Sequence, residues 1–150
     1  VTELITGHNL VELGIRVAQG EALPMKQEDI TWRGHAIQCR LNAEDPREFV
    51  PSPGRLWECH FPSGFGIRCD THAHPGYEMP GCFASLLAKL LVWGRDREDA
   101  VRRMKTALDE TMITGVEHLI PLHRRIMDEK DFNNGDITIQ YIDMHQELLG

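Results

Sequence analysis

The eight residues from 35 to 42, which read HAIQCRLN, constrain the fold most strongly. Apolar and polar side chains alternate along them, and a period of two is that of a strand with one buried face. The apolar face carries His35, Ile37, Cys39 and Leu41, and the other face carries Gln38, Arg40 and Asn42. The pattern therefore predicts a strand that presents an arginine on the side away from the core.

Other segments complete a mixed architecture. Asn9 is placed to cap a short helix over 9–19, and the polar connector after it could mark the border of an N-terminal piece. Residues 55–61 and 65–71 predict two more strands, and tight Pro/Gly turns between strands imply an antiparallel sheet. The apolar run 86–94 fits a buried strand or a helix, and we favour a strand that ends at Gly94.

The second half of the chain is predicted to be mainly helical. Asp96 can cap a helix that ends at Gly115, with an apolar stripe formed by Ala100, Val101, Met104, Ala107, Leu108 and Met112. The charges of 95–103 are expected to be a solvated face. A helix near 118–128, a turn at 133–136, a last strand at 137–142 and a short terminal helix follow. The expected fold class is α+β, an antiparallel sheet with packed helices.

Composition excludes several functions. The 150 residues are 41% hydrophobic and 26% charged, as expected for one globular domain. A net charge of −7 argues against a broad nucleic-acid or anionic-membrane surface, and no apolar run is long enough to span a bilayer. The four cysteines form no CxxC pair and are expected to be buried, reduced thiols of a cytoplasmic protein.

Three candidate sites can be weighed from the residues. His72 and His74 could share one side of an extended segment, but only Asp70 is nearby as a third ligand, so no metal is expected. Glu44 and Asp45 are adjacent and point apart on an extended chain. A turn in which an acidic side chain accepts hydrogen bonds from backbone N–H groups is therefore favoured over an acid/base pair.

Arg40 has two interpretations that the pattern alone leaves open. An exposed arginine on a strand can simply pair with a neighbouring carboxylate. Alternatively, a permanently charged, rigidly forked guanidinium on a strand can hold an anion or a developing oxyanion.

Four motifs in order, RGHAIQCRLNAEDP, PSPG, GFGIRCDTH and RMKTALDE, resemble the C-terminal domain of biotin carboxylase over nearly the whole chain. The resemblance implies an ATP-dependent ligase of acetyl-CoA, propionyl-CoA or pyruvate carboxylases. Such an enzyme uses MgATP (or Mn²⁺) and bicarbonate to carboxylate biotin on a carrier protein, and it works with a carboxyltransferase component. By the same resemblance Arg40 is the catalytic arginine, Ile139 lines the adenine pocket, and Phe65 and Arg68 lie in a homodimer interface.

The resemblance also implies a division of the chain. Residues 1–30 would be the end of an ATP-grasp domain and 31–150 the C-terminal domain. In the family the other phosphate, metal and bicarbonate groups precede this stretch, so the chain alone is expected to be inactive. Ala84 stands where the family usually has an Asp, and 115–119 depart from the usual GxxTN. A non-catalytic dimerisation or carrier-binding module is the alternative function.

Overall fold

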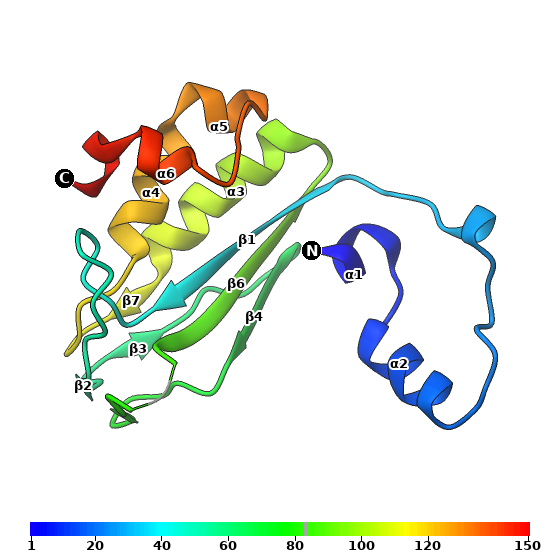
Figure 1. The fold of residues 1–150 in the computed structure, drawn as a ribbon, viewed down its shortest axis with the longest axis horizontal. Helices are drawn as coiled ribbons and strands as arrows, with labels where there is room; N and C mark the ends of the chain where they lie inside the picture. Colours follow the sequence, from blue (N-terminus) through cyan, green and yellow to red (C-terminus); the bar gives the residue numbers. More distant parts are fainter. Residues whose placement is uncertain (83) are drawn as a thin grey trace.

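The centre of the molecule is a three-stranded antiparallel sheet in the order β1–β6–β4. A computed structural model of the chain describes residues 1–82 and 84–150. The strands are β1 (His35–Asn42), β6 (Leu86–Gly94) and β4 (Ile67–Thr71). Helix α3 (Arg97–Glu110) packs on one face of this sheet, with α4 (Ile120–Asp128) beside it (Figure 1). The expected α+β class with an antiparallel sheet is confirmed.

The remaining elements are short. They are α1 (Thr2–Thr6), α2 (Leu10–Ala18), the 3-10 turns η1 (Gln27–Asp29) and η2 (Gln146–Leu149), the strand pairs β2 (Gly54–Arg55) with β5 (Glu78–Met79) and β3 (Cys59–His60) with β7 (Met112–Ile113), and the helices α5 (Lys130–Asn134) and α6 (Tyr141–Met144). No helix among the described residues combines the length and apolar character needed to cross a membrane.

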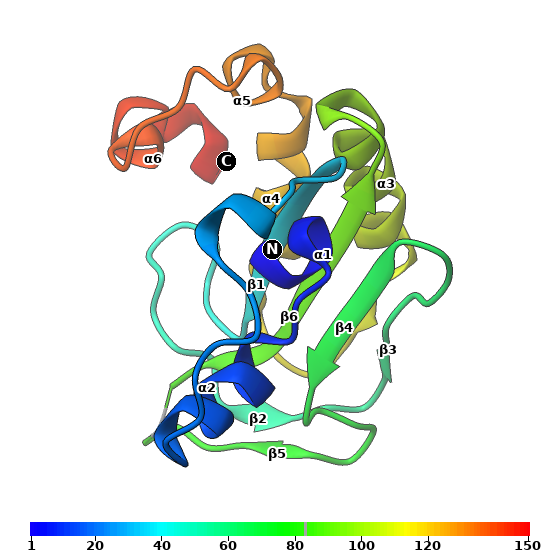
Figure 2. The ribbon, with the colours of Figure 1, turned by 90° about the vertical axis from the view of Figure 1, so that its right-hand side faces the viewer.

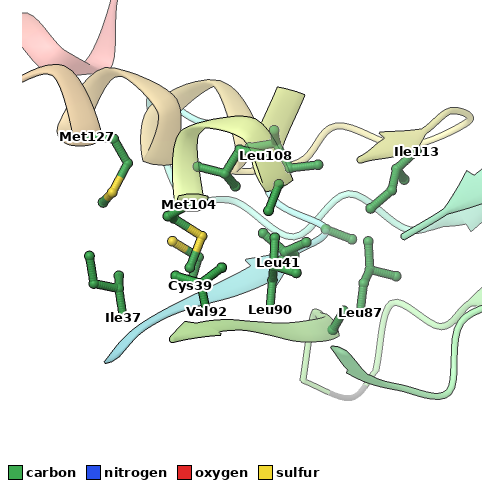
Figure 3. Packing of buried hydrophobic residues seen from close by; sticks show 14 of the residues in the cluster. Ile37, Cys39, Leu41, Leu87, Leu90, Val92, Met104, Leu108, Ile113 and Met127 are labelled. Carbon is green, nitrogen blue, oxygen red and sulfur yellow. The ribbon is translucent and has the colours of Figure 1, made fainter. Parts of the chain in front are cut away.

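The core lies between the sheet and α3. Figure 3 shows β1 and β6 presenting side chains toward Met104 and Leu108 of the helix. Register explains the arrangement, since Ile37, Cys39 and Leu41 of β1 stand opposite Val92, Leu90 and Ala88 of β6. All six are buried. Fully burying an aliphatic side chain such as that of Leu41 contributes about 1.5–3 kcal/mol. The predicted alternation of residues 35–42 is confirmed, because buried and exposed side chains alternate from Ile37 to Leu41.

Strand β6 runs directly into the start of α3. A Cβ atom on Gly94 would lie only 2.4 Å from the amide nitrogen of Ala100, so glycine is required for this close approach. Asp96 then caps the helix, and its side chain accepts a hydrogen bond from the amide of Asp99 at 2.8 Å. The predicted strand 86–94 and the predicted cap at Asp96 are both confirmed.

The end of α3 differs from the prediction. The helix stops at Glu110, and Met112, expected in its apolar stripe, lies in β7 and is 50% exposed. Gly115, expected to end the helix, instead has a φ of +104° and would place a Cβ atom 2.0 Å from the carbonyl oxygen of Arg55. Residues 112–113 pair with β3 instead of continuing the helix. Helical periodicity in the sequence could not reveal this pairing, because the partner strand lies about 50 residues away in the chain.

Two predicted strands are also wrong in detail. The segment 55–61 is divided between β2 and β3, which pair with different partners. The alternating segment 137–142 forms no strand: Tyr141 and Ile142 begin α6, and the residues before them are irregular. The apolar side chains that remain at this end, such as Leu148, pack with Leu122 and Tyr141 in a small second cluster.

The charged stretch 95–103 contains a buried carboxylate, contrary to the expected solvated face. Asp99 is only 4% exposed. Its carboxylate accepts hydrogen bonds from the backbone N–H of Arg95 at 3.1 Å, from Nε of Arg103 at 3.2 Å and from the guanidinium of Arg102. The Arg95 amide, followed by the two guanidinium groups, lowers the pKa of Asp99 from 3.8 to about 2. The carboxylate thus joins the end of β6 to the first turns of α3.

The N-terminal segment lies apart from this core. Figures 1 and 2 show α1 and α2 on the side of the sheet away from the helical layer, and neither helix buries a residue. Helix α2 is capped at Asn9 as predicted, whereas α1 was not anticipated. A groove of about 530 Å³ runs along this segment, with Leu10, Leu13, Val17, Leu23 and Trp32 among its lining residues.

Replacing Asp99 by Asn tests its role in the fold. Because the native pKa is lowered, the unfolded chain binds the proton more tightly, so the stabilisation is complete above the ordinary value of 3.8 and is lost as pH falls through about 2. We expect the wild-type chain to be more stable than Asp99→Asn at neutral pH, and the difference to shrink on acidification. Denaturant unfolding between pH 7 and pH 2 measures this.

The matched control is Asp136→Asn, because the exposed side chain of Asp136 forms no ion pair or hydrogen bond with any described residue. Its stability should follow the wild-type curve at every pH. A stability difference for Asp99→Asn that does not change with pH would contradict the assignment of an ionised, stabilising carboxylate.

Candidate functional site

The side of the sheet opposite α3 gathers the candidate site residues, and we call it the polar face. Cross-strand register places Gln38 of β1, Leu91 of β6 and Arg68 of β4 in one row. The next row contains Arg40, Lys89 and Asp70. Side chains directly opposite each other on neighbouring strands point to the same face, so these six define the polar face.

Arg40 lies in the middle of β1 and is exposed. Its backbone is fixed from the helical side, because Nε2–H of His123 on α4 donates to the Arg40 carbonyl oxygen at 2.8 Å. Burial lowers the pKa of His123. The guanidinium of Arg40 forms no ion pair or hydrogen bond with any residue of 1–82 or 84–150. Of its two interpretations, the paired surface arginine therefore finds no support.

The nearest acidic groups in sequence are used elsewhere. Asp45 accepts hydrogen bonds from the amides of Arg47 and Glu48 at 2.8 and 2.9 Å, and these bonds lower its pKa. This confirms the turn expected there. Glu44 accepts a hydrogen bond from Nδ2 of Asn42 at 3.0 Å and another from the hydroxyl of Ser85.

The Glu44 cluster ties the end of β1 to the start of β6. The carbonyl oxygen of Ser85 also accepts the amide hydrogen of Ala43 at 2.7 Å. Ala84, which stands where a carboxylate is usual in the resembling family, is exposed just before Ser85. Phe83, which precedes Ala84 in the stretch that differs from the usual family sequence, lies outside the described residues. The carboxylate of Glu44 therefore lies where β1 ends and β6 begins.

Arg68 joins the sheet to the N-terminal segment. Its guanidinium contacts Glu3 at 2.6 Å and Asp70 at 2.8 Å, and hydrogen bonds to these carboxylates raise the Arg68 pKa above its ordinary range. The other oxygen of Glu3 accepts the Leu10 amide at the start of α2 at 2.9 Å. Sequence reasoning missed Glu3, because a contact across 65 positions leaves no periodic signal.

Phe65 lies just before β4 and is 80% exposed. Its ring packs edge-to-face on Trp93 with centroids 6.1 Å apart. The guanidinium of Arg103 lies 5.9 Å from the ring centroid, and Nη1 of Arg103 donates to the Phe65 carbonyl oxygen at 3.0 Å. The ring is therefore held firmly while its outer surface stays open.

Two further candidates are Ile139 and the pair His72 and His74. Ile139, predicted on a strand, lies in the irregular segment before α6 and is fully exposed. His72 and His74 both pack edge-on against Tyr77, with centroids 5.0 and 5.8 Å from it. Asp70, their possible third ligand, is paired with Arg68. The described residues contain no group of three metal-ligating side chains.

The cysteines differ partly from the expectation of buried thiols. Only Cys39 is buried, and burial raises its pKa to about 12. Cys59 and Cys69 are half-buried, and Cys82 is exposed.

An antiparallel sheet with one helix-covered face and one polar face defines an α+β domain. Residues 38–144 match the family model described as the biotin carboxylase C-terminal domain. The chain belongs to that family.

Curated relatives agree with this assignment. The chain is 47% identical over 143 residues to biotin carboxylase of Haemophilus influenzae, covering 95% of this chain and 32% of the relative. It is 49% identical over 151 aligned positions to the chloroplastic biotin carboxylase of Arabidopsis thaliana, covering 99% and 28%. The chain thus spans about a third of the length of the curated relatives it matches.

A solved structure is similar throughout. It is the biotin carboxylase domain dimer of 2-oxoglutarate carboxylase from Hydrogenobacter thermophilus, in complex with MgADP, ADP and bicarbonate. The two chains are 45% identical with a TM-score of 0.96, and the alignment covers 100% of this chain and 33% of that one.

The contact between Arg68 and Glu3 predicts a local effect. Glu3→Gln keeps the shape of the side chain but removes its charge, so both the ion pair and the charged cap of α2 weaken. We expect faster amide hydrogen exchange at Leu10 and through α2, while the amides of β1 and β6 remain protected. Hydrogen exchange measured by NMR tests this, with Glu12→Gln, whose Arg16 contact is a longer 3.8 Å, as the control. Unchanged exchange in α2 would contradict the linking role of Glu3.

Proposed function

We propose that this chain is the C-terminal part of a biotin carboxylase. The whole protein would use MgATP and bicarbonate to carboxylate biotin on a carrier protein, as the first half-reaction of an acyl-CoA or pyruvate carboxylase. The observation that carries the proposal is Arg40, which lies on strand β1 of a domain in this family and has no partner among the described residues. A solved relative with nearly the same fold holds bicarbonate and MgADP.

Arg40 would act on negative charge. A guanidinium offers several N–H donors in a fixed fork, which suits a carboxylate-like anion or a developing oxyanion on the biotin ureido group. Its backbone is held through His123, and its side chain has no competing partner among the described residues. A preorganised donor of this kind stabilises a transition state without first breaking an internal ion pair.

The described residues would supply only one wall of the site. They contain no group of three metal-ligating side chains, and we propose that other parts of the whole protein hold the metal of MgATP. Ile139, which is fully exposed, would provide apolar surface for the adenine ring. No chemical step is therefore assigned to a metal ligand or a phosphate-binding residue within this chain.

Exposed apolar side chains of α2 support a domain border near residue 30. We propose that residues 1–30 complete an ATP-grasp domain and that 31–150 form the C-terminal domain. In support, the family match begins at residue 38, and α2 leaves Val11 69% exposed and Ile15 56% exposed. An apolar helix surface of this size is normally covered by further polypeptide, and the relatives are about three times as long as this chain.

We further propose a homodimer, a biotin carrier protein and a carboxyltransferase component as partners, and a cytoplasmic location. Support for the dimer comes from the Hydrogenobacter domain, which is a dimer, and from the exposed, rigidly supported ring of Phe65. The non-catalytic module remains a second candidate only because Ala84 replaces a usual carboxylate.

Arg40→Ala in the full-length protein separates catalysis from folding. Loss of a transition-state donor lowers turnover by on the order of 10²–10³-fold. Loss of an exposed, unpaired arginine changes the free energy of unfolding by less than about 1 kcal/mol. Arg40→Lys keeps the charge without the fork and should also be impaired.

Biotin-dependent ATP cleavage and denaturant unfolding are the two measurements, with Arg47→Ala as the exposed-arginine control. Near-wild-type activity of Arg40→Ala, or a full-length protein with no bicarbonate-dependent ATP cleavage at all, would favour the non-catalytic module.

Phe65→Ala should weaken self-association, because exposed aromatic side chains beside arginines are frequent anchors of interfaces. Sedimentation velocity of the full-length protein over a wide concentration range measures the effect. Trp57→Ala is the matched control. Trp57 is likewise an exposed aromatic residue, at 65% exposure, and its ring lies against the guanidinium of Arg55 rather than that of Arg103. Equal association of Phe65→Ala and the wild type would place the interface elsewhere.

A further inference from the structure

The guanidinium of Arg97, in the first turn of α3, uses all three of its nitrogen atoms in contacts with other elements. Nε donates to the carbonyl oxygens of Phe132 at 3.2 Å and Asn133 at 3.0 Å, and Nη2 donates to the same Phe132 oxygen. Nη1 contacts Nε2 of His35 at 3.0 Å. Because a guanidinium has donors only, the His35 nitrogen accepts this bond. One side chain thus joins the start of β1, the start of α3 and the end of α5.

The bonds from Arg97 complete the C-terminal end of a short helix. The last carbonyl groups of a helix have no partner within it, and a cationic side chain can supply one. Helix α5 has only five residues, too few to be stable by itself. Gly135 follows it with a φ of +88°, and its amide donates to the Phe132 carbonyl oxygen at 3.2 Å. The carbonyl group that Arg97 binds therefore also fixes the turn by which the chain leaves α5.

The connection from α5 to α6, residues 136–140, is held at its two ends. All of it is exposed, and none of its hydrogen bonds reaches a described residue outside 131–144. At its far end Tyr141 is buried and stacks on His145, with ring centroids 4.4 Å apart. In Figure 2 the connection lies at the edge of the molecule. Its position therefore depends on the Arg97 contacts at one end and on the burial of Tyr141 at the other.

We propose that Arg97 is a positioning residue for nucleotide binding, because it holds the segment 136–140, and Ile139 within it, where that side chain can contact the adenine ring. Ile139 is fully exposed and has no packing of its own to fix it. The contact with His35 ties the same segment to β1, the strand that carries Arg40. This inference rests on the proposed function, in which Ile139 provides apolar surface for the adenine, and adds the residue that places it.

Arg97→Gln should weaken nucleotide binding without changing the chemical step. Glutamine lacks the charge and the fork, so the segment occupies its position for only part of the time. The apparent affinity for a ligand falls in proportion to the fraction of protein in the competent state. A fraction of about one tenth raises the dissociation constant for MgADP and the KM for MgATP about tenfold. The kcat and the KM for bicarbonate should stay near their wild-type values, because the segment is in place in the bound complex.

The experiment uses the full-length protein. Calorimetry measures MgADP binding, and ATP cleavage measures kcat and both KM values. Arg97→Lys keeps the charge but offers a single donor group, and should lie between the wild type and Arg97→Gln. Arg47→Gln is the matched control, since the exposed Arg47 side chain forms no ion pair or hydrogen bond with any described residue. In an Ile139→Ala background, Arg97→Gln should add little further loss of MgADP affinity, because it acts through Ile139.

Hydrogen exchange measured by mass spectrometry tests the holding role without nucleotide. Exchange over 131–141 should quicken in Arg97→Gln, while β6 stays protected. Unchanged exchange there would overturn the inference, and so would unchanged MgADP affinity or an equal loss with and without Ile139. A fall in kcat that follows a fall in melting temperature would make Arg97 a purely structural residue and overturn it too. If the wild-type protein binds no MgADP and cleaves no ATP with bicarbonate, the proposed function fails, and the exchange measurement still judges the role of Arg97 in holding the segment.

Discussion

The structure depends on the pairing of β6 with β1 and β4, because β6 is the only one of the three strands with a partner on each side. Its apolar residues face α3 together with those of β1, and Gly94 lets the helix start directly against the strand end. A shift of one residue in either pairing would turn the core side chains outward. Burial of Leu41, Leu90 and Met104 therefore fixes the register, and the register in turn brings Arg40 and Lys89 together.

The charged side chains of the sheet and of α3 occur in two contrasting arrangements. Asp99 is surrounded by a backbone amide and the guanidinium groups of Arg102 and Arg103, so its charge is fully used in holding β6 to α3. Arg40 and Lys89 stand beside each other with no carboxylate bonded to either among the described residues. The first arrangement stabilises the fold. The second places two cations opposite each other on neighbouring strands, where like charges destabilise a sheet.

Prediction from sequence succeeded where local pattern and tertiary packing agree. The strand at 35–42, the strand at 86–94 and the cap at Asp96 all follow from alternation, hydrophobicity and a capping side chain within a few residues. It failed where a distant partner decided the outcome. Met112 pairs with His60, the segment 55–61 is shared between two strand pairs, and 137–142 finds no strand partner among the described residues.

By itself the sequence determined that one face of residues 35–42 is buried and that Arg40 lies on the other, because side chains alternate strictly along a strand. The ordered motifs also determined the family, which residues 38–144 match. Only the tertiary structure decided that Lys89 is the neighbour of Arg40, that Glu3 joins Arg68, and that Asp99 is buried. The physical reason is that register and burial depend on contacts between residues far apart in the chain, such as 40 with 89, and no local periodicity records which distant segments will meet.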